Sequence, residues 1–407
     1  MESYQSGKRV ALETLGCKLN QAESEGIGRK LTAVGCILVS AREEADVYIL
    51  NTCTVTQIAD RKSRHCLRLA RRRSPHALLV ALGCYAAGES ETLTRLGAEL
   101  VLDNTSKDKL ISILTEMGYL APSVPGTHAP VRTRSMVAVQ DGCDRFCSYC
   151  IVPHVRGREK SCAADEVVAA VQQRVAEGYL EVVLTGTEIG AYRWVDTDLA
   201  GLIRRILDET AIRRLRVSSL QPQEVTPALL GLWRDTRLCP HFHLSLQSGS
   251  DSVLRSMNRA YSTTAYSEIL QRIRALMPYA GITTDVIVGF PGETEQEFQQ
   301  SLDFVAAMGF SRVHVFGYSR RRGTPAAEMP GQVDPALKKE RSRLIRAAGA
   351  ESAARFRQSL LGQPESVLWE EDAGDGLGGK HQEALRQAHP HRCLHVAQDG
   401  EQGPLLR

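Results

Sequence analysis

The stretch QDGCDRFCSYCIVPHVRGREKS, residues 140–161, holds three cysteines within eight positions. Cys143, Cys147 and Cys150 follow the spacing C-x-x-x-C-x-x-C, and three thiols in one short loop indicate a metal site. A closed zinc site takes four ligands, so His154 is a candidate for the fourth. Three cysteines also suit a four-iron, four-sulfur cubane whose remaining iron stays open for an exogenous ligand. An open position of this kind is typical of a catalytic rather than a structural site.

The cysteine loop follows an apolar run that opens a long alternation of strands and helices. Strands are predicted at 135–140, 181–185, 215–219, 242–246, 283–288 and 312–317. Helices are predicted between and after them at 164–177, 198–209, 226–235, 263–276 and 294–308. Six βα units favour a partial (β/α)6 barrel of the TIM type, and barrel active sites lie at the carboxyl ends of the strands. A last helix, 335–361, should begin after Asp334 as N-cap, with Pro335 at its first position.

The first 120 residues show a shorter version of the same alternation. Strands are predicted at 9–15, 46–50 and 77–82, and helices at 21–34, 56–73 and 89–96. This pattern is typical of a parallel, Rossmann-like α/β domain. The segment APSVPGTHAPVRT, residues 121–133, contains three prolines and reads as the linker to the barrel.

A second set of three cysteines is spread over the N-terminal domain. Cys17, Cys53 and Cys84 each come one to three residues after a predicted strand. The carboxyl ends of parallel strands share one edge of a sheet, so the three thiols should converge there. Isolated buried cysteines are common, but the shared placement favours a second metal site over three unrelated core residues.

Composition narrows the remaining possibilities. The chain has 407 residues, of which 43% are hydrophobic and 24% charged, with a net charge of +3 and eleven cysteines. No signal-peptide core and no apolar stretch of membrane-spanning length is present, so we expect no membrane partner and a cytoplasmic location. In a reducing compartment, clustered cysteines indicate metal binding or catalysis rather than disulfides.

The barrel cysteines, with Tyr149 before the last of them, resemble the signature of radical S-adenosylmethionine (SAM) enzymes. This resemblance implies that SAM binds the open iron of a [4Fe-4S] cluster and is cleaved to a 5′-deoxyadenosyl radical. It also implies SAM contacts from residues at the ends of barrel strands. The candidates are Tyr149, Gly186, Glu188, Ser219, Ser245, Gln247, Val288 and Gly289, although Thr187 stands where such enzymes often have a second glycine.

The two cysteine sets together resemble the methylthiotransferase family, over about residues 8–362. The matching segments are TLGCKLNQAESE (14–25), LNTCTVT (50–56), ALGCYAA (81–87), DGCDRFCSYCIVPHVRGREKS (141–161), LSLQSGSDSVLRSMNRAY (244–261) and IVGFPGETEQEF (287–298). The resemblance implies an auxiliary-cluster domain at 8–120, a linker at 121–133 and a radical SAM domain at 134–362. It assigns Cys17, Cys53 and Cys84 to an auxiliary [4Fe-4S] cluster, and Cys143, Cys147 and Cys150 to the radical SAM cluster. The tail, 363–407, is expected to be a truncated or divergent form of the family's RNA-binding TRAM domain.

Within the family, Lys18-Leu19 after the first cysteine resembles the branch that acts on N6-threonylcarbamoyladenosine in tRNA. The implied enzyme adds a methylthio group to carbon 2 of this adenine beside the anticodon. It would use one SAM to methylate a sulfur, a second SAM as radical source, and an electron donor such as flavodoxin or ferredoxin. The alternatives are methylthiolation of N6-isopentenyladenosine in tRNA or of a ribosomal protein. A non-enzymatic iron–sulfur or zinc protein that binds RNA is the rival from a different class.

Basic segments favour a tRNA substrate over a protein one. Seven cations lie in DRKSRHCLRLARRR, residues 60–73, and three arginines follow the sixth barrel strand at 320–322. Such runs are often only solvated faces, but their local density in a nearly neutral chain predicts phosphate contacts.

Overall fold

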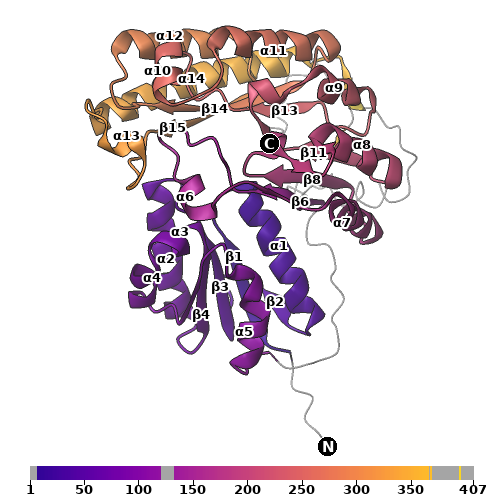
Figure 1. The fold of residues 1–407 in the computed structure, drawn as a ribbon, viewed down its shortest axis with the longest axis vertical. Helices are drawn as coiled ribbons and strands as arrows, with labels where there is room; N and C mark the ends of the chain where they lie inside the picture. Colours follow the sequence, from indigo (N-terminus) through magenta and orange to yellow (C-terminus); the bar gives the residue numbers. More distant parts are fainter. Residues whose placement is uncertain (1–6, 121–132, 366, 369–393, 396–407) are drawn as a thin grey trace, which may run out of the picture.

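The computed structural model describes residues 7–120, 133–365, 367–368 and 394–395, and Figure 1 shows its two main bodies. The predicted linker, apart from its last residue, and nearly all of the predicted TRAM-like tail lie outside the described residues. In the tail, β16 (Pro364–Glu365) pairs antiparallel with β17 (Leu394–His395).

The N-terminal domain is a five-stranded parallel sheet in the order β2-β1-β3-β4-β5. Its strands are β1 (Arg9–Thr14), β2 (Ile37–Val39), β3 (Val47–Thr52), β4 (Leu78–Gly83) and β5 (Leu100–Leu102). Its helices are α1 (Lys18–Ala33), α2 (Gln57–Arg73), α3 (Cys84–Gly88), α4 (Ser90–Arg95) and α5 (Leu110–Glu116). The predicted Rossmann-like organisation is therefore confirmed.

Side chains of the central strand β3 alternate between two apolar cores. Ile49 packs with Leu31 of α1 and Leu114 of α5, whereas Leu50 packs with Leu67 of α2 on the other face. A fully buried strand must be apolar on both sides, which explains the continuous run VYIL in this part of the sequence.

The second domain is an open barrel made of two four-stranded sheets, in the orders β11-β8-β6-β7 and β12-β13-β14-β15. The barrel strands are β6 (Arg134–Asp141), β8 (Glu181–Gly186), β11 (Arg214–Val217), β12 (Ser219–Leu220), β13 (His241–Leu244), β14 (Gly281–Val288) and β15 (Arg312–Gly317). Pairing between these strands is parallel, as predicted. Short antiparallel strands add to the rim, namely β7 (Lys160–Ser161) on β6 and the hairpin of β9 (Arg193–Trp194) and β10 (Thr197–Asp198).

The predicted strand 215–219 is divided at Ser218. Its first part pairs with β8, whereas Ser219 pairs with His243 of β13, so the chain changes neighbours within one residue. Helices cover the outside of the barrel, and α14 continues the series across β15 and α12. Helix α6 (Val152–Arg156) instead lies against α3 between the two domains. The other helices of this domain are α7 (Ala164–Ala176), α8 (Leu199–Glu209), α9 (Pro227–Leu230), α10 (Asp251–Ser256), α11 (Thr263–Leu276), α12 (Glu295–Ala307), α13 (Pro325–Glu328) and α14 (Pro335–Ser359).

Several predicted helices have different bounds in the structure. The helix predicted at 21–34 begins three residues earlier, with Cys17 as N-cap of α1. The helix predicted at 89–96 is the short α4, preceded by the separate α3. The helix predicted at 226–235 is one turn of α9 followed by a 3-10 turn. Asp334 caps α14 as predicted, since its side chain accepts a hydrogen bond of 2.7 Å from the Ala336 amide.

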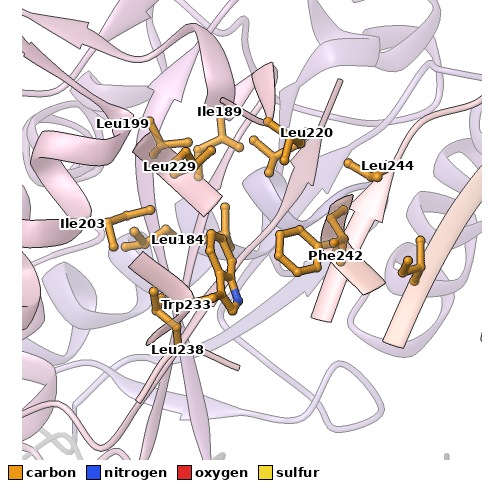
Figure 2. Close-up of a cluster of buried hydrophobic side chains, with 14 of the residues drawn as sticks. Leu184, Ile189, Leu199, Ile203, Leu220, Leu229, Trp233, Leu238, Phe242 and Leu244 are labelled. Carbon is orange, nitrogen blue, oxygen red and sulfur yellow. The ribbon is translucent and has the colours of Figure 1, made fainter. Parts of the chain in front are cut away.

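The barrel core lies between the strands and the outer helices. Figure 2 shows Leu184, Phe242 and Leu244 from the strands meeting Trp233 and Leu199 from the covering layer. The Trp233 and Phe242 ring centroids are 4.5 Å apart. Outward-facing strand residues thus form the core, which leaves the inward-facing residues for the site.

The two domains are joined along β6 and again at the barrel mouth. Helix α1 runs against β6 (Figure 1). There Glu25 accepts hydrogen bonds from Ser135 Oγ at 2.7 Å and the Met136 amide at 3.0 Å. On the far side, buried Arg321 donates to Asp60 at 2.7 Å. The carboxyl edge of the N-terminal sheet is thereby held over the barrel mouth.

Candidate functional site

The N-terminal cysteine set, defined as Cys17, Cys53 and Cys84, lies at the carboxyl edge of the first sheet. Cys17 precedes α1, Cys53 follows β3, and Cys84 opens α3 directly after β4. Gly16 has φ +103°, and a Cβ on it would lie 2.9 Å from Cys53 Sγ. The close approach of the backbone before Cys17 to the Cys53 side chain therefore requires glycine at this position.

Two thiols of this set are buried, and their surroundings oppose ionisation. Burial raises the pKa of Cys53 to about 12 and also raises the pKa of Cys84. The charge of Arg156 acts in the opposite direction on both thiols. Metal ligation needs thiolates, so Arg156 is placed to favour the ligating form.

Two asparagines flank the same thiols. Cys17 Sγ lies 3.5 Å from Asn20 Oδ1, and Asn104 Nδ2 lies 3.6 Å from Cys84 Sγ. Asn104 also donates to the Val155 carbonyl oxygen at 2.7 Å, which links the set to the barrel domain. Hydrogen bonds of this kind orient metal ligands and tune the potential of a cluster.

The barrel cysteine set, defined as Cys143, Cys147 and Cys150, lies in the loop between β6 and α6. The Cys150 amide donates to the Cys147 carbonyl oxygen at 2.9 Å, which closes a turn, and Phe146 has φ +48°. Burial raises the pKa of Cys143, and it raises the pKa of Cys150 to about 12. The loop geometry therefore presents three thiols on one side, and loading them with metal must release protons.

The spacing of the thiols separates a cluster from a single zinc ion. Sulfur ligands of one tetrahedral zinc lie about 3.8 Å apart, given a Zn–S distance of about 2.3 Å. Within the described part of the chain, neither cysteine set has all its sulfurs within 4.8 Å of one another. Three spread thiols with no fourth cysteine fit three corners of a cubane better than one metal ion. His154 is not drawn in as a fourth ligand, because its ring packs edge-on against Phe146 with centroids 6.4 Å apart.

Arg156 connects the supports of the two sets. It ends α6, the helix that follows Cys150, and only 3% of its side chain is exposed. It donates to Asn20 Oδ1 at 2.6 Å and to one oxygen each of Glu23 and Asp141 at 2.8 Å. A buried cation paired with two carboxylates therefore lies between the cysteine sets. No sequence pattern indicates this role for Arg156.

Glu188, predicted to contact SAM, lies beside the barrel set. Its Oε2 accepts a hydrogen bond of 3.0 Å from Cys143 Sγ, and Oε1 accepts bonds from Arg145 Nε at 2.5 Å and Gln221 Nε2 at 2.6 Å. Burial and the neighbouring Glu188 raise the pKa of Glu224 to about 8, so these two carboxyl groups share a proton at neutral pH.

Gly186 is required where β8 approaches β6. A Cβ at this position would lie 2.9 Å from Gln140 O and from Gln140 Oε1. The same Gln140 Oε1 accepts the Glu188 amide at 2.8 Å, which fixes the strand end that carries Glu188. Thr187, which stands in place of a second glycine, donates to Asp141 at 3.2 Å and turns away from this contact.

A cavity of about 180 Å³ lies at the mouth between the two domains. The domains both contribute to its wall, which is lined by Val55, Thr56, Tyr149, Cys150, Ile151, Val152, Gln247, Asp285, Ile287, Phe316, Gly317, Tyr318 and Ser319. Of the predicted SAM contacts, Tyr149 and Gln247 therefore line a cavity next to the barrel set. Gln247 has φ +66°, a strained backbone position that aims this strand end into the mouth.

The other predicted contacts are placed differently. Val288 is fully buried in the outer core, so Ile287 rather than Val288 lines the cavity. Strand alternation explains this difference, because neighbouring residues face opposite sides of a sheet. A Cβ on Gly289 would lie 2.1 Å from Lys338 Cγ, so α14 covers that residue. Ser219 and Ser245 are half-buried at the ends of β12 and just after β13, outside the cavity lining.

Many of the predicted phosphate-binding cations serve structural roles instead. Arg71 donates to the carbonyl oxygens of Pro75 and Ala77, Arg64 donates to the Tyr85 hydroxyl at 2.6 Å, and Arg321 is the interdomain contact. The cations that remain exposed are Arg61, Lys62, Arg68, Arg72, Arg320 and Arg322.

A polar chain inside the barrel was not anticipated from sequence. Asp285 lies between two histidines, at 3.1 Å from His243 Nε2 and 3.1 Å from His314 Nδ1. These residues lie on the neighbouring strands β13, β14 and β15 and face inward. Burial raises the pKa of Asp285, but the hydrogen bonds and charges of the two histidines outweigh it and hold this pKa well below its usual range.

Family models match both domains of the chain. The radical SAM superfamily model matches residues 137–305, and the model of the uncharacterized protein family UPF0004 matches residues 9–103. Each match falls on one of the two bodies that hold a cysteine set. Among the described helices, none is both long and apolar enough to cross a bilayer.

Curated relatives match the chain over most of its length. The threonylcarbamoyladenosine tRNA methylthiotransferase MtaB of Aquifex aeolicus is 36% identical, covering 88% of this chain and 92% of the relative. The protein of the same name from Bacillus subtilis is 34% identical, covering 89% and 85%. A tRNA-2-methylthio-N(6)-dimethylallyladenosine synthase of Pelotomaculum thermopropionicum is 32% identical, covering 91% and 88%.

Solved structures agree at the level of the fold. The radical S-adenosylmethionine methyltransferase TsrM from Kitasatospora setae, with cobalamin and a [4Fe-4S] cluster bound, has a TM-score of 0.55 and 14% identity. The match covers 79% of this chain and 77% of the other.

Proposed function

Because this chain belongs to the radical SAM methylthiotransferases, we propose that it adds a methylthio group to carbon 2 of N6-threonylcarbamoyladenosine in tRNA. The observation that carries the proposal is the pair of three-cysteine sets at one domain interface. The chain that holds them is 36% identical to a relative named for this reaction. A family member with two such sets has a place for SAM and a place for the sulfur on either side of the same gap.

The enzyme uses SAM and two [4Fe-4S] clusters. When bound, these groups supply the methyl group, the sulfur and the 5′-deoxyadenosyl radical that removes hydrogen from carbon 2. We assign the auxiliary cluster to Cys17, Cys53 and Cys84 in residues 8–120, and the radical SAM cluster to Cys143, Cys147 and Cys150 in residues 134–362. The convergence of each set and the absence of a compact four-ligand zinc geometry among the described residues support this assignment.

The protein side chains have separate tasks in this scheme. Glu188 Oε2 lies 3.0 Å from Cys143 Sγ. We assign to this carboxylate a hydrogen bond accepted from the ammonium group in the methionyl part of SAM. Tyr149 and Gln247 line the adjoining cavity and are placed to contact its nucleoside part. Arg156 and its two carboxylates hold the two cysteine sets at a fixed separation. These tasks are binding, orientation and exclusion of water, which are the protein's share of cofactor chemistry.

The tRNA would approach the interface along the exposed cations of α2 and of the loop after β15. Arg61, Lys62 and Arg68 stay exposed on α2, whose first amide, Gln57 N, bonds Ser319 Oγ at the mouth at 3.0 Å. A helix that begins at the mouth and carries free cations can hold backbone phosphates while a base enters. A small redox protein such as flavodoxin or ferredoxin would supply the electron, and the exposed Phe146 and Arg158 offer it a surface beside the barrel set.

Methylthiolation of N6-isopentenyladenosine remains the alternative reaction, because a relative named for the dimethylallyl product is 32% identical over nearly the same span. An excess of positive charge inside the barrel favours the threonylcarbamoyl substrate, which carries a carboxylate. The two substrates differ only in the group on N6, so one assay distinguishes the reactions.

The test is turnover by anaerobically reconstituted protein. Iron and sulfide should each reach about eight per chain, since two cubanes hold four each. With SAM and a reductant, the protein should convert tRNA carrying N6-threonylcarbamoyladenosine to the 2-methylthio nucleoside, detected by mass spectrometry. One zinc per chain and no product would favour the non-enzymatic alternative. Product only from isopentenyladenosine-containing tRNA would reject the proposed substrate while retaining the reaction class.

A further inference from the structure

The interior of the barrel contains a cluster of charged groups that neither cysteine set uses. It faces inward from α1, β6, β8, β11 and β14. We call it the interior charge cluster, and its members are Lys18, Arg134, Glu181, Arg214, Arg216 and Asp285. Four cations therefore surround two carboxylates, an arrangement that leaves positive charge in excess in a partly buried site.

The two carboxylates are already engaged by other groups. Glu181, almost fully buried, accepts hydrogen bonds from Arg216 Nε at 2.7 Å and Arg214 Nε at 3.2 Å. Asp285 is held between His243 and His314. Neither carboxylate is within ion-pair distance of Lys18 among the described contacts, although both are among its nearest charges.

Lys18 is the cation without a partner. Within the described part of the chain its ammonium group has no hydrogen bond and no ion pair, and it is half-buried rather than solvated. Arg216 binds Glu181 through Nε alone, and its two terminal nitrogens have no partner in the same part of the chain. A half-buried lysine near a guanidinium whose terminal nitrogens have no partner among the described residues can form a receptor for an anion.

The nearby His241 does not add to the positive charge. Burial, followed by the charges of Arg216 and Lys18, lowers the pKa of His241 to about 3, so the ring is neutral. His241 Nδ1 is buried and has no hydrogen-bond partner among the described residues. The wall of the cluster is therefore polar and incompletely satisfied, which is typical of a ligand pocket rather than of a closed core.

The cluster extends from the amino ends of β6, β8 and β11 toward the gap between the cysteine sets, where Lys18 and Asp285 are its nearest members. Lys18 is the residue after Cys17, so its ammonium group is within one side-chain length of the N-terminal set. Asp285 belongs both to the cluster and to the lining of the mouth cavity next to Tyr149 and Cys150. A base whose carbon 2 approaches the N-terminal set would therefore have its neighbouring edge over this cluster.

We propose that Lys18 and Arg216 bind the carboxylate of the threonylcarbamoyl group and thereby select this nucleoside. The inference rests on the proposed function and identifies the part of the site that recognises the substituent. Carbon 2 and N6 lie on the same edge of adenine on either side of N1, so a group on N6 extends beside carbon 2. The carboxylate supplies the negative charge that the interior charge cluster lacks.

The same cluster excludes the uncharged isopentenyl group. An apolar substituent would leave Lys18 and Arg216 without water and without an anion, which costs binding energy. A site built around a polar group rejects the analogue that lacks this group more strongly than an apolar site rejects a polar one. Selectivity in this enzyme is therefore a matter of charge, not of pocket size.

The test compares the reconstituted holoenzyme with Lys18→Gln, Lys18→Arg and Lys30→Gln. Lys30 lies exposed in the last turn of the same helix and is the matched control. The substrates are anticodon stem-loops that carry N6-threonylcarbamoyladenosine or its neutral methylamide. Binding is measured without reductant, and kcat and KM are measured with it.

Wild type and Lys30→Gln should prefer the carboxylate substrate by about 10- to 100-fold, mainly through Kd and KM. Lys18→Gln should reduce this preference to about threefold or less at unchanged iron content, and Lys18→Arg should retain most of it. Equal binding of the two stem-loops by wild type, or an undiminished preference in Lys18→Gln, would overturn the inference. Failure of wild type to make product from any stem-loop would instead reject the proposed function, because the binding preference is read separately from turnover.

Discussion

Arg156 donates a hydrogen bond of 2.6 Å to Asn20 Oδ1 across 136 positions of sequence. One residue ends the helix that follows the barrel cysteine set, and the other lies three residues after Cys17. This bond, with the ion pairs to Glu23 and Asp141, holds the two cysteine sets in one rigid interface. The geometry on which methylthio transfer depends is therefore set by a cation that binds no substrate.

Replacing Arg156 with methionine should uncouple the two sets. The change leaves Glu23 and Asp141 without their buried partner and removes the charge that favours ionised Cys53 and Cys84. Iron after reconstitution should fall from about eight to about four per chain, with the remaining signal from the barrel set. Arg158→Met, at an exposed position, should retain about eight. Full loading of Arg156→Met would show that the N-terminal set does not depend on this residue.

Breaking the contact on the other side of the mouth should loosen the domain interface. Arg321 bonds Asp60 and the Thr54 carbonyl oxygen and is buried, so Arg321→Met should lower the free energy of unfolding by about 3–5 kcal/mol. Arg322→Met, exposed next to it, should change this free energy by less than about 0.5 kcal/mol. Urea unfolding of the two metal-free variants measures the difference, and equal midpoints would contradict the structural role.

The exposed cations of α2 should appear in the salt dependence of tRNA binding. If Lys62 and Arg68 each contact one phosphate, Lys62→Gln/Arg68→Gln should reduce the slope of log K against log salt by about 2. Lys339→Gln, an exposed lysine on the outer helix α14, should leave the slope unchanged. Fluorescence titration at several salt concentrations measures it, and an unaltered slope in the double variant would exclude α2 from the interface.

Stability should fall with acid in a window set by His241. Its folded pKa is about 3, below the usual value of 6.5, because burial disfavours the charged ring. The unfolded chain therefore binds a proton that the folded chain does not, and stability present above pH 6.5 is lost as the pH falls toward 3. The slope is at most about 1.4 kcal/mol per pH unit.

His241→Gln should flatten this dependence between about pH 6 and pH 4, whereas His76→Gln, at an exposed position, should not. Chemical denaturation at a series of pH values provides the measurement. A slope shared by wild type and His241→Gln would mean that His241 takes up its proton in the folded state.

Local patterns were sufficient to predict the parallel strands and the cysteines. Residues 46–50 and 77–82 are mostly apolar runs, and 312–317 alternates polar and apolar side chains. β3, β4 and β15 lie on these segments within two residues. The edge strands β2 and β5 were missed because each has only three residues, too few for a period to show.

Contacts between distant segments could not be predicted in this way. Asn20 and Glu23, which bind Arg156, and Asp60, which binds Arg321, come from the other domain, and no spacing along the chain encodes such pairs. Val288 was expected at the mouth because the sequence locates the strand but does not show which of its residues point into the barrel. A shift of one residue reverses the side to which a strand residue points, and only the pairing of β14 with its neighbours fixes that side.

The two cysteine sets also differ in the stage of folding at which their thiols come together. The barrel set comes from eight consecutive residues, so a locally ordered loop is enough to gather its thiols. Cys17, Cys53 and Cys84 meet only after β1, β3 and β4 have paired across some seventy residues, a slow step because distant segments must first find one another. Maturation of the protein therefore has an order imposed by topology, in which the first domain completes its folding before it can accept iron.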